Sequence, residues 1–294
     1  MSAIKPTASE RVFDAFNIIL LAVLSLLFLI PFLAVLSTSF ISAEESMRRG
    51  AFILIPHKID FGAYEMLLKR GMIIYNAYKV TLFRVTVGTF LNLLFTATLA
   101  YGLARRTLPG RNGIVLFIFL TMIFHGGLIP SYMLIDKLGL KNTLWVLVIP
   151  GLISAWNLFI MRNFFLSLPE ELEESGIIDG ATPAVILWKI IIPLSMPAIA
   201  TIGLFYAVHH WNDWFGASIY INDQSKMPIQ VVMRNILLSG ILQDESQVEY
   251  IRNPPPAATL KSAVVVISTL PILFVYPFIQ KFFVKGMMVG SIKG

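Results

Sequence analysis

Six stretches of the chain lack Asp, Glu, Lys and Arg over about 20 residues, the length that an α-helix needs to cross a bilayer. They are residues 15–43, 85–104, 112–135, 142–161, 190–212 and 262–280. Inside a membrane each backbone polar group must be satisfied internally, and long continuously apolar runs suit helices better than alternating barrel strands. The pattern predicts an all-α polytopic membrane protein with six transmembrane helices.

The composition favours lipid as the surrounding solvent. The 294 residues are 56% hydrophobic and only 14% charged, whereas ordinary soluble domains carry about 25% charged residues. The net charge of +6 comes from small groups of Lys and Arg beside the apolar runs. No basic face with interleaved aromatic residues is visible, so we expect membrane lipid and no nucleic acid as a partner.

Cysteine and histidine usage argues against a metal site. The chain has no cysteine, and its four histidines show no HExxH or similar ligand spacing. We therefore expect no metal site in this chain.

The orientation depends on how basic residues are counted. With a cytoplasmic N-terminus, the inner segments hold 10 Lys and Arg residues and the outer segments hold 13. The positive-inside rule applies to short loops, however, and two long connections, residues 44–84 and 213–261, carry most of the outer count. The short turn 105–111 concentrates three arginines, so we expect both termini in the cytoplasm.

The polar segment between the fourth and fifth runs predicts two short helices joined by a bend. Ser167 and Glu170 have the spacing of a capping box, which predicts a first helix there. Gly180 can adopt the left-handed conformation that ends a helix. Thr182 is a suitable N-cap for a second helix, with Pro183 at its first position.

The spacing in this segment resembles a known motif. Glu174 is followed by two small residues, three further positions, Gly180, nine positions, and then "IIIP". This resembles the EAA loop of permease subunits in ATP-binding-cassette (ABC) importers, and "DGATPAVILWKIIIPLSMP" is similar to the MalG-like carbohydrate branch, which handles oligosaccharides and polysaccharide products. Ser175 and Gly176 stand where the motif has alanines, and Ile192 stands where it has leucine. "AYGLARRTLPGR" and "VKGMMVGSIKG" extend the resemblance to the C-terminus.

The resemblance implies the fold of a type I ABC importer permease and a division of the chain. Residues 1–75 would form the N-terminal tail, the first transmembrane helix and an extracytoplasmic loop. Residues 76–285 would form the permease core of five transmembrane helices with a cytoplasmic coupling loop at 167–193. Residues 286–294 would form a cytoplasmic C-terminal tail near the ATPase.

The resemblance also implies the partners. They are a second permease subunit, taken as a non-identical homologue, a cytoplasmic ATPase dimer, and an extracytoplasmic solute-binding protein. The chain itself would be a multi-pass protein of the bacterial inner membrane. The resemblance implies that ATP and Mg are bound by the ATPase and that this chain has no cofactor and no catalytic residue of its own, in agreement with its lack of a GxxxxGK[ST] loop. The substrate would be an oligosaccharide, with acidic, alginate-type products as the first choice. The residues expected to couple to the ATPase are Leu172, Glu174, Ser175, Gly176, Ile177, Ile178, Asp179, Gly180, Ala181 and Pro183.

The translocation pathway has four candidate residues, each with an alternative role. Trp211 and Trp214, with Asn212 between them, either contact sugar rings or belong to an interfacial aromatic belt. His125, in the middle of the third run, either lines a cavity or packs between helices.

Two other functions fit the residues less well than an importer permease. A secondary transporter driven by an ion gradient would need repeats and intramembrane carboxylates, yet no Asp or Glu lies in the six runs. A membrane-embedded enzyme could use His209, His210 and Asp213, but adjacent residues on a helix point about 100° apart and do not converge on one metal. We therefore prefer the importer permease.

Overall fold

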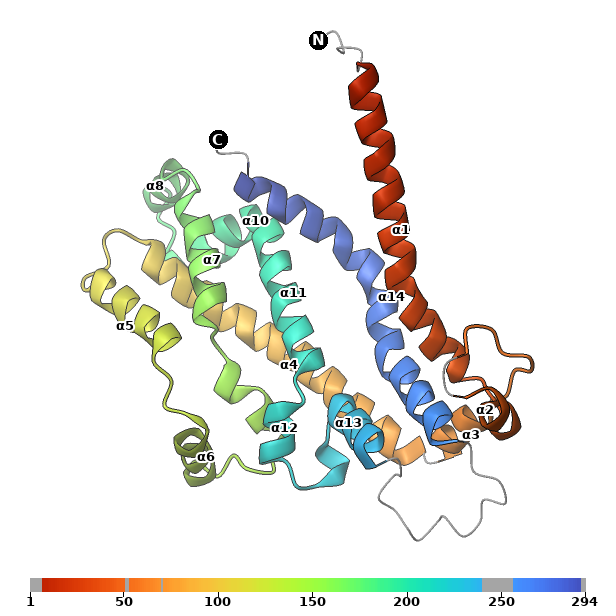
Figure 1. The fold of residues 1–294 in the computed structure, drawn as a ribbon. Coiled ribbons are helices and arrows are strands. Elements are labelled where there is room, and N and C mark those ends of the chain that lie inside the picture. Colours follow the sequence, from red (N-terminus) through yellow and green to blue (C-terminus); the bar gives the residue numbers. More distant parts are fainter. Residues whose placement is uncertain (1–6, 51–52, 70, 240–255, 292–294) are drawn as a thin grey trace. The chain divides into compact units, whose positions relative to one another are not determined.

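The computed structural model describes residues 7–50, 53–69, 71–239 and 256–291, and within these ranges it is helical with no strand (Figure 1). The chain divides into two compact units. One comprises Met1–Arg70 with Asn235–Leu270, and the other comprises Gly71–Arg234 with Pro271–Gly294. The division expected from the sequence, at residues 75 and 285, stays a prediction.

The N-terminal part of the first unit contains α1 (Ala8–Thr38), α2 (Ala43–Arg49) and α3 (Gly62–Lys69). A capping box starts α1: the Thr7 N–H donates to Glu10 Oε2 at 2.7 Å, and Thr7 Oγ1 accepts from the Glu10 N–H at 3.4 Å. Most of the apolar side chains of α1 are exposed, as expected for a helix whose solvent is lipid.

The second unit carries the permease core. Its helices are α4 (Gly71–Ala104), α5 (Arg111–Ile123), α6 (Leu128–Lys137), α7 (Ala155–Leu166), α8 (Glu171–Ile178), α9 (Pro183–Ile186), α10 (Ile192–Leu194), α11 (Met196–Asn212) and α12 (Phe215–Tyr220). Short 3-10 turns occur at Leu144–Leu147, Ile149–Gly151 and Gln224–Lys226, and a π-helical turn at Leu187–Ile191. Two further helices, α13 (Ile229–Ser239) and α14 (Ala257–Ser291), have residues in both units.

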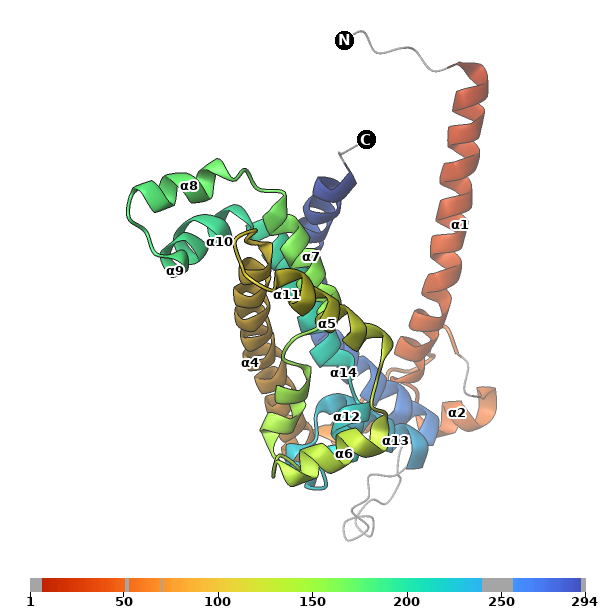
Figure 2. The ribbon, with the colours of Figure 1, turned by 90° about the vertical axis from the view of Figure 1, so that its left-hand side faces the viewer.

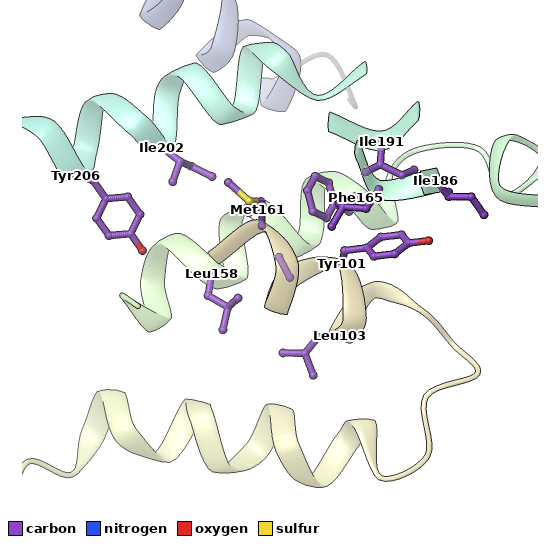
Figure 3. Close-up of a cluster of buried hydrophobic side chains, with 12 residues drawn as sticks. Tyr101, Leu103, Leu158, Met161, Phe165, Ile186, Ile191, Ile202 and Tyr206 are labelled. Carbon is purple, nitrogen blue, oxygen red and sulfur yellow. The ribbon is translucent and has the colours of Figure 1, made fainter. Parts of the chain in front are cut away.

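The core of the second unit forms around α4, which packs against both α7 and α11. Buried apolar side chains from these three helices meet residues of the segment that follows α8 (Figure 3). The large members of this cluster are Tyr101, Leu103, Leu158, Met161, Phe165, Ile186, Leu187, Ile191, Ile202 and Tyr206. The polar segment between α7 and α11 is therefore anchored to the helical bundle.

Three helices are long and apolar enough to cross a membrane: Ser9–Thr38, Ile73–Ala104 and Ala257–Val275. Three bent pairs raise the number of spans to six if each pair is one span, within the residues that the structure describes. The pairs are Arg111–Ile123 with Leu128–Lys137 at 115°, Leu144–Gly151 with Ala155–Leu166 at 51°, and Pro183–Leu194 with Met196–Asn212 at 86°.

The predicted third, fourth and fifth spans are therefore not continuous helices, although their number and order agree with the sequence. In the third, the chain leaves the helix after Ile123 and passes through Gly127, whose φ is +88°. In the fifth, Pro193 and Pro197 flank the break at Ser195. Apolarity alone did not show these breaks, because Gly, Ser and Pro interrupt a helix without introducing charge.

Candidate functional site

The segment between α7 and α11 forms a helix, a bend and a second helix, as predicted, and it projects from one end of the second unit (Figure 2). Gly180 makes the bend with φ +79°. The Ala181 N–H donates to the Gly176 carbonyl and the Gly180 N–H to the Ile177 carbonyl, both at 2.9 Å. This pair of bonds is a Schellman motif, which ends α8. We call residues 167–193 the coupling loop.

The second helix of the coupling loop also begins as predicted, but the first does not. Thr182 Oγ1 accepts from the Val185 N–H at 3.4 Å, and Pro183 is the first residue of α9. The capping box at Ser167 and Glu170 is wrong, because α7 extends to Leu166 and the Ser167 hydroxyl instead donates to the Phe164 carbonyl at 2.7 Å. Glu170 makes no side-chain cap bond to α8.

Gly176 has a packing role that its helix propensity did not suggest. It is buried, and a Cβ at this position would lie 3.1 Å from Ile186 Cγ1 and 3.2 Å from Ile190 Cδ1. The absence of a side chain therefore lets α8 lie closely against the segment that follows it. The alanine of the motif would fit here only if these isoleucines moved slightly.

The outer surface of the coupling loop combines apolar and acidic side chains. Ile178 is 85% exposed and Ile177 is 51% exposed. Glu174 and Asp179 are also exposed, and neither forms an ion pair within the described chain. The remaining predicted coupling residues divide by burial: Ser175 and Pro183 are exposed, whereas Leu172 and Ala181 are half-buried. A surface of this kind suits a protein partner better than a bilayer.

Two other carboxylates of the coupling loop point toward the turn after α4. Glu173 Oε1 lies 2.7 Å from Arg105 Nε and accepts from the Tyr101 hydroxyl at 3.1 Å, and Glu170 Oε1 lies 2.9 Å from Arg106 Nη2. A cavity of about 270 Å³ lies between the turn and the coupling loop. These contacts place the arginine-rich turn and the coupling loop at the same end of the second unit.

A polar network that the sequence did not predict involves α4 between Arg84 and Thr96. Arg84 was expected in the outer connection, but α4 includes it and its side chain is 4% exposed. It donates to the Leu147 carbonyl at 3.1 Å and to the Asp213 carbonyl at 2.7 Å, and it pairs with the Asp213 carboxylate. Asp213 follows the last residue of α11. Burial raises its pKa, but the charge of Arg84 and the hydrogen bonds from Arg84 and the Gly216 N–H together outweigh burial and leave the pKa below its ordinary value.

Asn92 forms hydrogen bonds with the backbone just before α7, where the fourth span is bent. Its Nδ2 donates to the carbonyls of Gly151 and Leu152 at 2.7 and 2.8 Å, and its Oδ1 accepts from His210 Nε2 at 2.7 Å. Backbone that leaves a helix at membrane depth needs such partners, since lipid offers none. Asn92 was a hint in the sequence, because a polar side chain inside an apolar run usually faces the protein interior.

A second pair completes the contacts at this break. The Tyr206 hydroxyl accepts from the Ser154 N–H at 3.0 Å and shares a hydrogen bond with Thr96 at 2.8 Å. Side chains of α4 and α11 thus satisfy backbone groups on both sides of the break. The network joins three helices of the second unit.

The four predicted pathway residues are not brought together by any hydrogen bond or ring contact in the part of the chain that the structure describes. His125 is exposed and lies in the break between α5 and α6, outside any helix. Trp211 is buried, whereas Asn212 is exposed. The ring of Trp214 is 38% exposed and has the Arg234 guanidinium 4.4 Å from its centroid.

The alternative enzyme hypothesis is not supported by the geometry. His210 Nε2 is hydrogen-bonded to Asn92, and the carboxylate of Asp213 is paired with Arg84. Among the described residues, no group of three His, Cys, Asp or Glu side chains could hold a metal ion.

Comparisons with known proteins agree with these features. The family model for binding-protein-dependent transport system inner membrane components matches residues 3–289. A Bacillus subtilis protein described as the polygalacturonan/rhamnogalacturonan transport system permease protein YtcP is 43% identical over 97% of this chain and 99% of its own length. Protein LplC of the same organism is 42% identical over 98% of this chain and 97% of its own length.

A solved structure gives the same result for the fold. One chain from the crystal structure of a bacterial ABC transporter involved in the import of the acidic polysaccharide alginate superposes with a TM-score of 0.88. It is 32% identical in sequence, and the match covers 96% of this chain and 100% of that chain.

Proposed function

The chain belongs to the family of binding-protein-dependent transport system inner membrane components, and from this premise we propose how it couples transport to a motor and what it carries. It is a transmembrane permease subunit of an ABC importer with a type I permease fold, and it is not an enzyme. The family implies a partner permease, an ATPase and a solute-binding protein. We propose that the second permease is a non-identical homologue and that two ATPase subunits, which bind ATP and Mg, form a dimer.

The observation that carries the coupling proposal is the surface of the coupling loop. Ile178 is 85% exposed beside carboxylates that have no ion pair within the described chain, so this surface suits insertion into a cleft of the ATPase. ATP-driven closure of the ATPase dimer would then move α8 and shift the permease pair from inward-facing to outward-facing. Coupling of this kind is reciprocal, so substrate delivery must also stimulate hydrolysis.

Gly180→Pro tests this role. Proline fixes φ near −65°, whereas the bend requires +79°. We expect the reconstituted complex to lose substrate-stimulated ATP hydrolysis while its spans still assemble. The matched control is Gly139→Pro, since Gly139 also has a positive φ of +67° but follows α6, outside the coupling loop. Equal loss in both variants would show a general folding effect and contradict the proposal.

The energy source has its own test. Vesicles that hold the complete importer should take up substrate only with ATP inside. Uptake driven by a proton or sodium gradient without nucleotide would instead support a secondary transporter.

We propose that the coupling loop, the turn after α4 and both termini are cytoplasmic, and that the connection 213–261 faces the solute-binding protein. The positive-inside rule supports this orientation, since three arginines lie in the short turn. The chain has no cysteine, so single-cysteine variants can be labelled without background. A cysteine at Thr107 should react with a membrane-impermeant maleimide only from the cytoplasmic side, and one at Ser225 only from the outside. The reverse pattern would overturn the orientation.

The proposed substrates are oligosaccharides released from polysaccharides, with acidic ones first. YtcP and the alginate importer support this class through the polysaccharides that they are described as carrying. In this chain, the Trp214 ring and the Arg234 guanidinium together offer an aromatic surface and a cation, which suits a sugar that carries a carboxylate. Competition of acidic and neutral oligosaccharides for ATP-driven uptake tests the class.

A further inference from the structure

The turn after α4 connects the coupling loop to α4, the longest helix that lies wholly within the second unit. Tyr101 lies in the last turn of α4, and Arg105 follows the helix directly. The Tyr101 hydroxyl donates to Glu173 Oε1 at 3.1 Å, and Arg105 Nε forms an ion pair with the same oxygen at 2.7 Å. The Arg105 guanidinium also lies over the Tyr101 ring, 5.8 Å from its centroid. One carboxylate of α8 is thus held by two side chains from the C-terminal end of α4.

The neighbouring ion pair has different surroundings. The side chains of Arg105 and Glu173 are 25% and 26% exposed, whereas those of Arg106 and Glu170 are 75% and 64% exposed. Exposed pairs are screened by water and salt and contribute little. Half-buried charges that also accept a hydroxyl hydrogen bond are screened less and have a more defined geometry. The two pairs therefore form a natural comparison within one turn.

α4 also connects this point to the rest of the permease core. It is a single helix of 34 residues, about 50 Å long. Arg84 and Asn92 donate to carbonyls of the segment before α7, and Thr96 shares a hydrogen bond with Tyr206 of α11. A displacement of α8 that is passed to the C-terminal end of α4 therefore reaches a network that fixes two other spans.

We propose that the Arg105–Glu173 pair, together with the Tyr101 hydroxyl, transmits movement of the coupling loop to α4, so that Arg105 is a positioning residue for coupled transport. This inference rests on the proposed role of the coupling loop and adds the route by which its movement enters the transmembrane helices. The physical basis is a contiguous set of hydrogen-bonded groups between α8 and the bundle. The exposed Arg106–Glu170 pair does not share this role.

The test uses the complete importer in vesicles, with substrate transported per ATP hydrolysed as the measurement. Arg105→Gln should lower this ratio by about fivefold or more, the usual lower range of a coupling effect, while the ATPase still copurifies with the permease. Arg106→Gln is the matched control and should keep the wild-type ratio. The double variant Arg105→Gln/Glu173→Gln should lose no more than Arg105→Gln, since both changes break the same contact.

Tyr101→Phe removes one hydroxyl without changing charge and should lower the ratio less than Arg105→Gln does. This variant keeps the proposal testable if Arg105→Gln assembles poorly. A wild-type ratio in Arg105→Gln or, where that variant does not assemble, in Tyr101→Phe would overturn the inference while leaving ATP-driven uptake in place. Absence of ATP-driven uptake in the wild-type importer would instead contradict the proposed function itself.

Discussion

Gly88 provides a sharp test of the polar network, because its lack of a side chain makes room for His210. A Cβ on Gly88 would lie 2.6 Å from His210 Nε2, closer than van der Waals contact permits. The imidazole is 3% exposed and bonded to Asn92, so it cannot move aside without losing that bond. Gly88→Ala should therefore strain the packing of α11 on α4 and break the His210–Asn92 hydrogen bond.

The size of the effect follows from opposing contributions. Replacing glycine by alanine inside a helix stabilises it by about 1 kcal/mol. Overpacking costs about 1–3 kcal/mol, and leaving a buried hydrogen-bonding group unpaired costs about 1–3 kcal/mol. We expect a net destabilisation of about 1–5 kcal/mol for Gly88→Ala.

Gly102 is the matched control in the same helix, because a Cβ there would meet nothing within 4 Å. Gly102→Ala should be neutral or slightly stabilising. The measurement is thermal unfolding of the purified complex in detergent, together with uptake in vesicles. If Gly88→Ala unfolds at the same temperature as Gly102→Ala, the close packing of α4 on His210 is not a feature of the protein.

Three further predictions concern the same unit. Asn92→Asp keeps the side-chain size but removes both donors to the carbonyls before α7, so thermal unfolding should occur several degrees lower; unchanged unfolding would contradict this role. The pKa of Asp213 is below its ordinary value of 3.8, so the folded state binds fewer protons than the unfolded state; the contribution of its pair with Arg84 is present above pH 3.8 and is lost as the pH falls through the lowered pKa. Asp213→Asn should be less stable than wild type at neutral pH and converge with it in acid unfolding, and a constant difference at all pH values would refute the assignment. Gly176→Val would place two methyl groups against Ile186 and should increase protease cleavage within the coupling loop, whereas an unchanged digestion rate would exclude close packing there.

Local signals in the sequence were sufficient for the coupling loop. The bend at Gly180 and the start of α9 at Thr182 depend on residues within a few positions of each other, and the structure confirms both. Even here, the predicted capping box at Ser167 was wrong. Helix α7 extends to Leu166, so Ser167 is the C-cap of α7 and not the N-cap of α8. The choice depends on packing of α7 against α4, which local spacing does not contain.

The apolar runs determined the number and order of the spans, since hydropathy is a property of each residue and needs no partner. Only the tertiary structure decided where the third, fourth and fifth spans break, and that Arg84 lies inside α4. A buried charge is tolerated when an opposite charge is paired with it, and unpaired backbone groups at a helix break are tolerated when other groups form hydrogen bonds with them. Asp213, 129 positions away in the chain, does this for Arg84, and Asn92 does it for the carbonyls of Gly151 and Leu152. Such partners become neighbours only after the helices have packed, and for this reason the sequence alone did not reveal them.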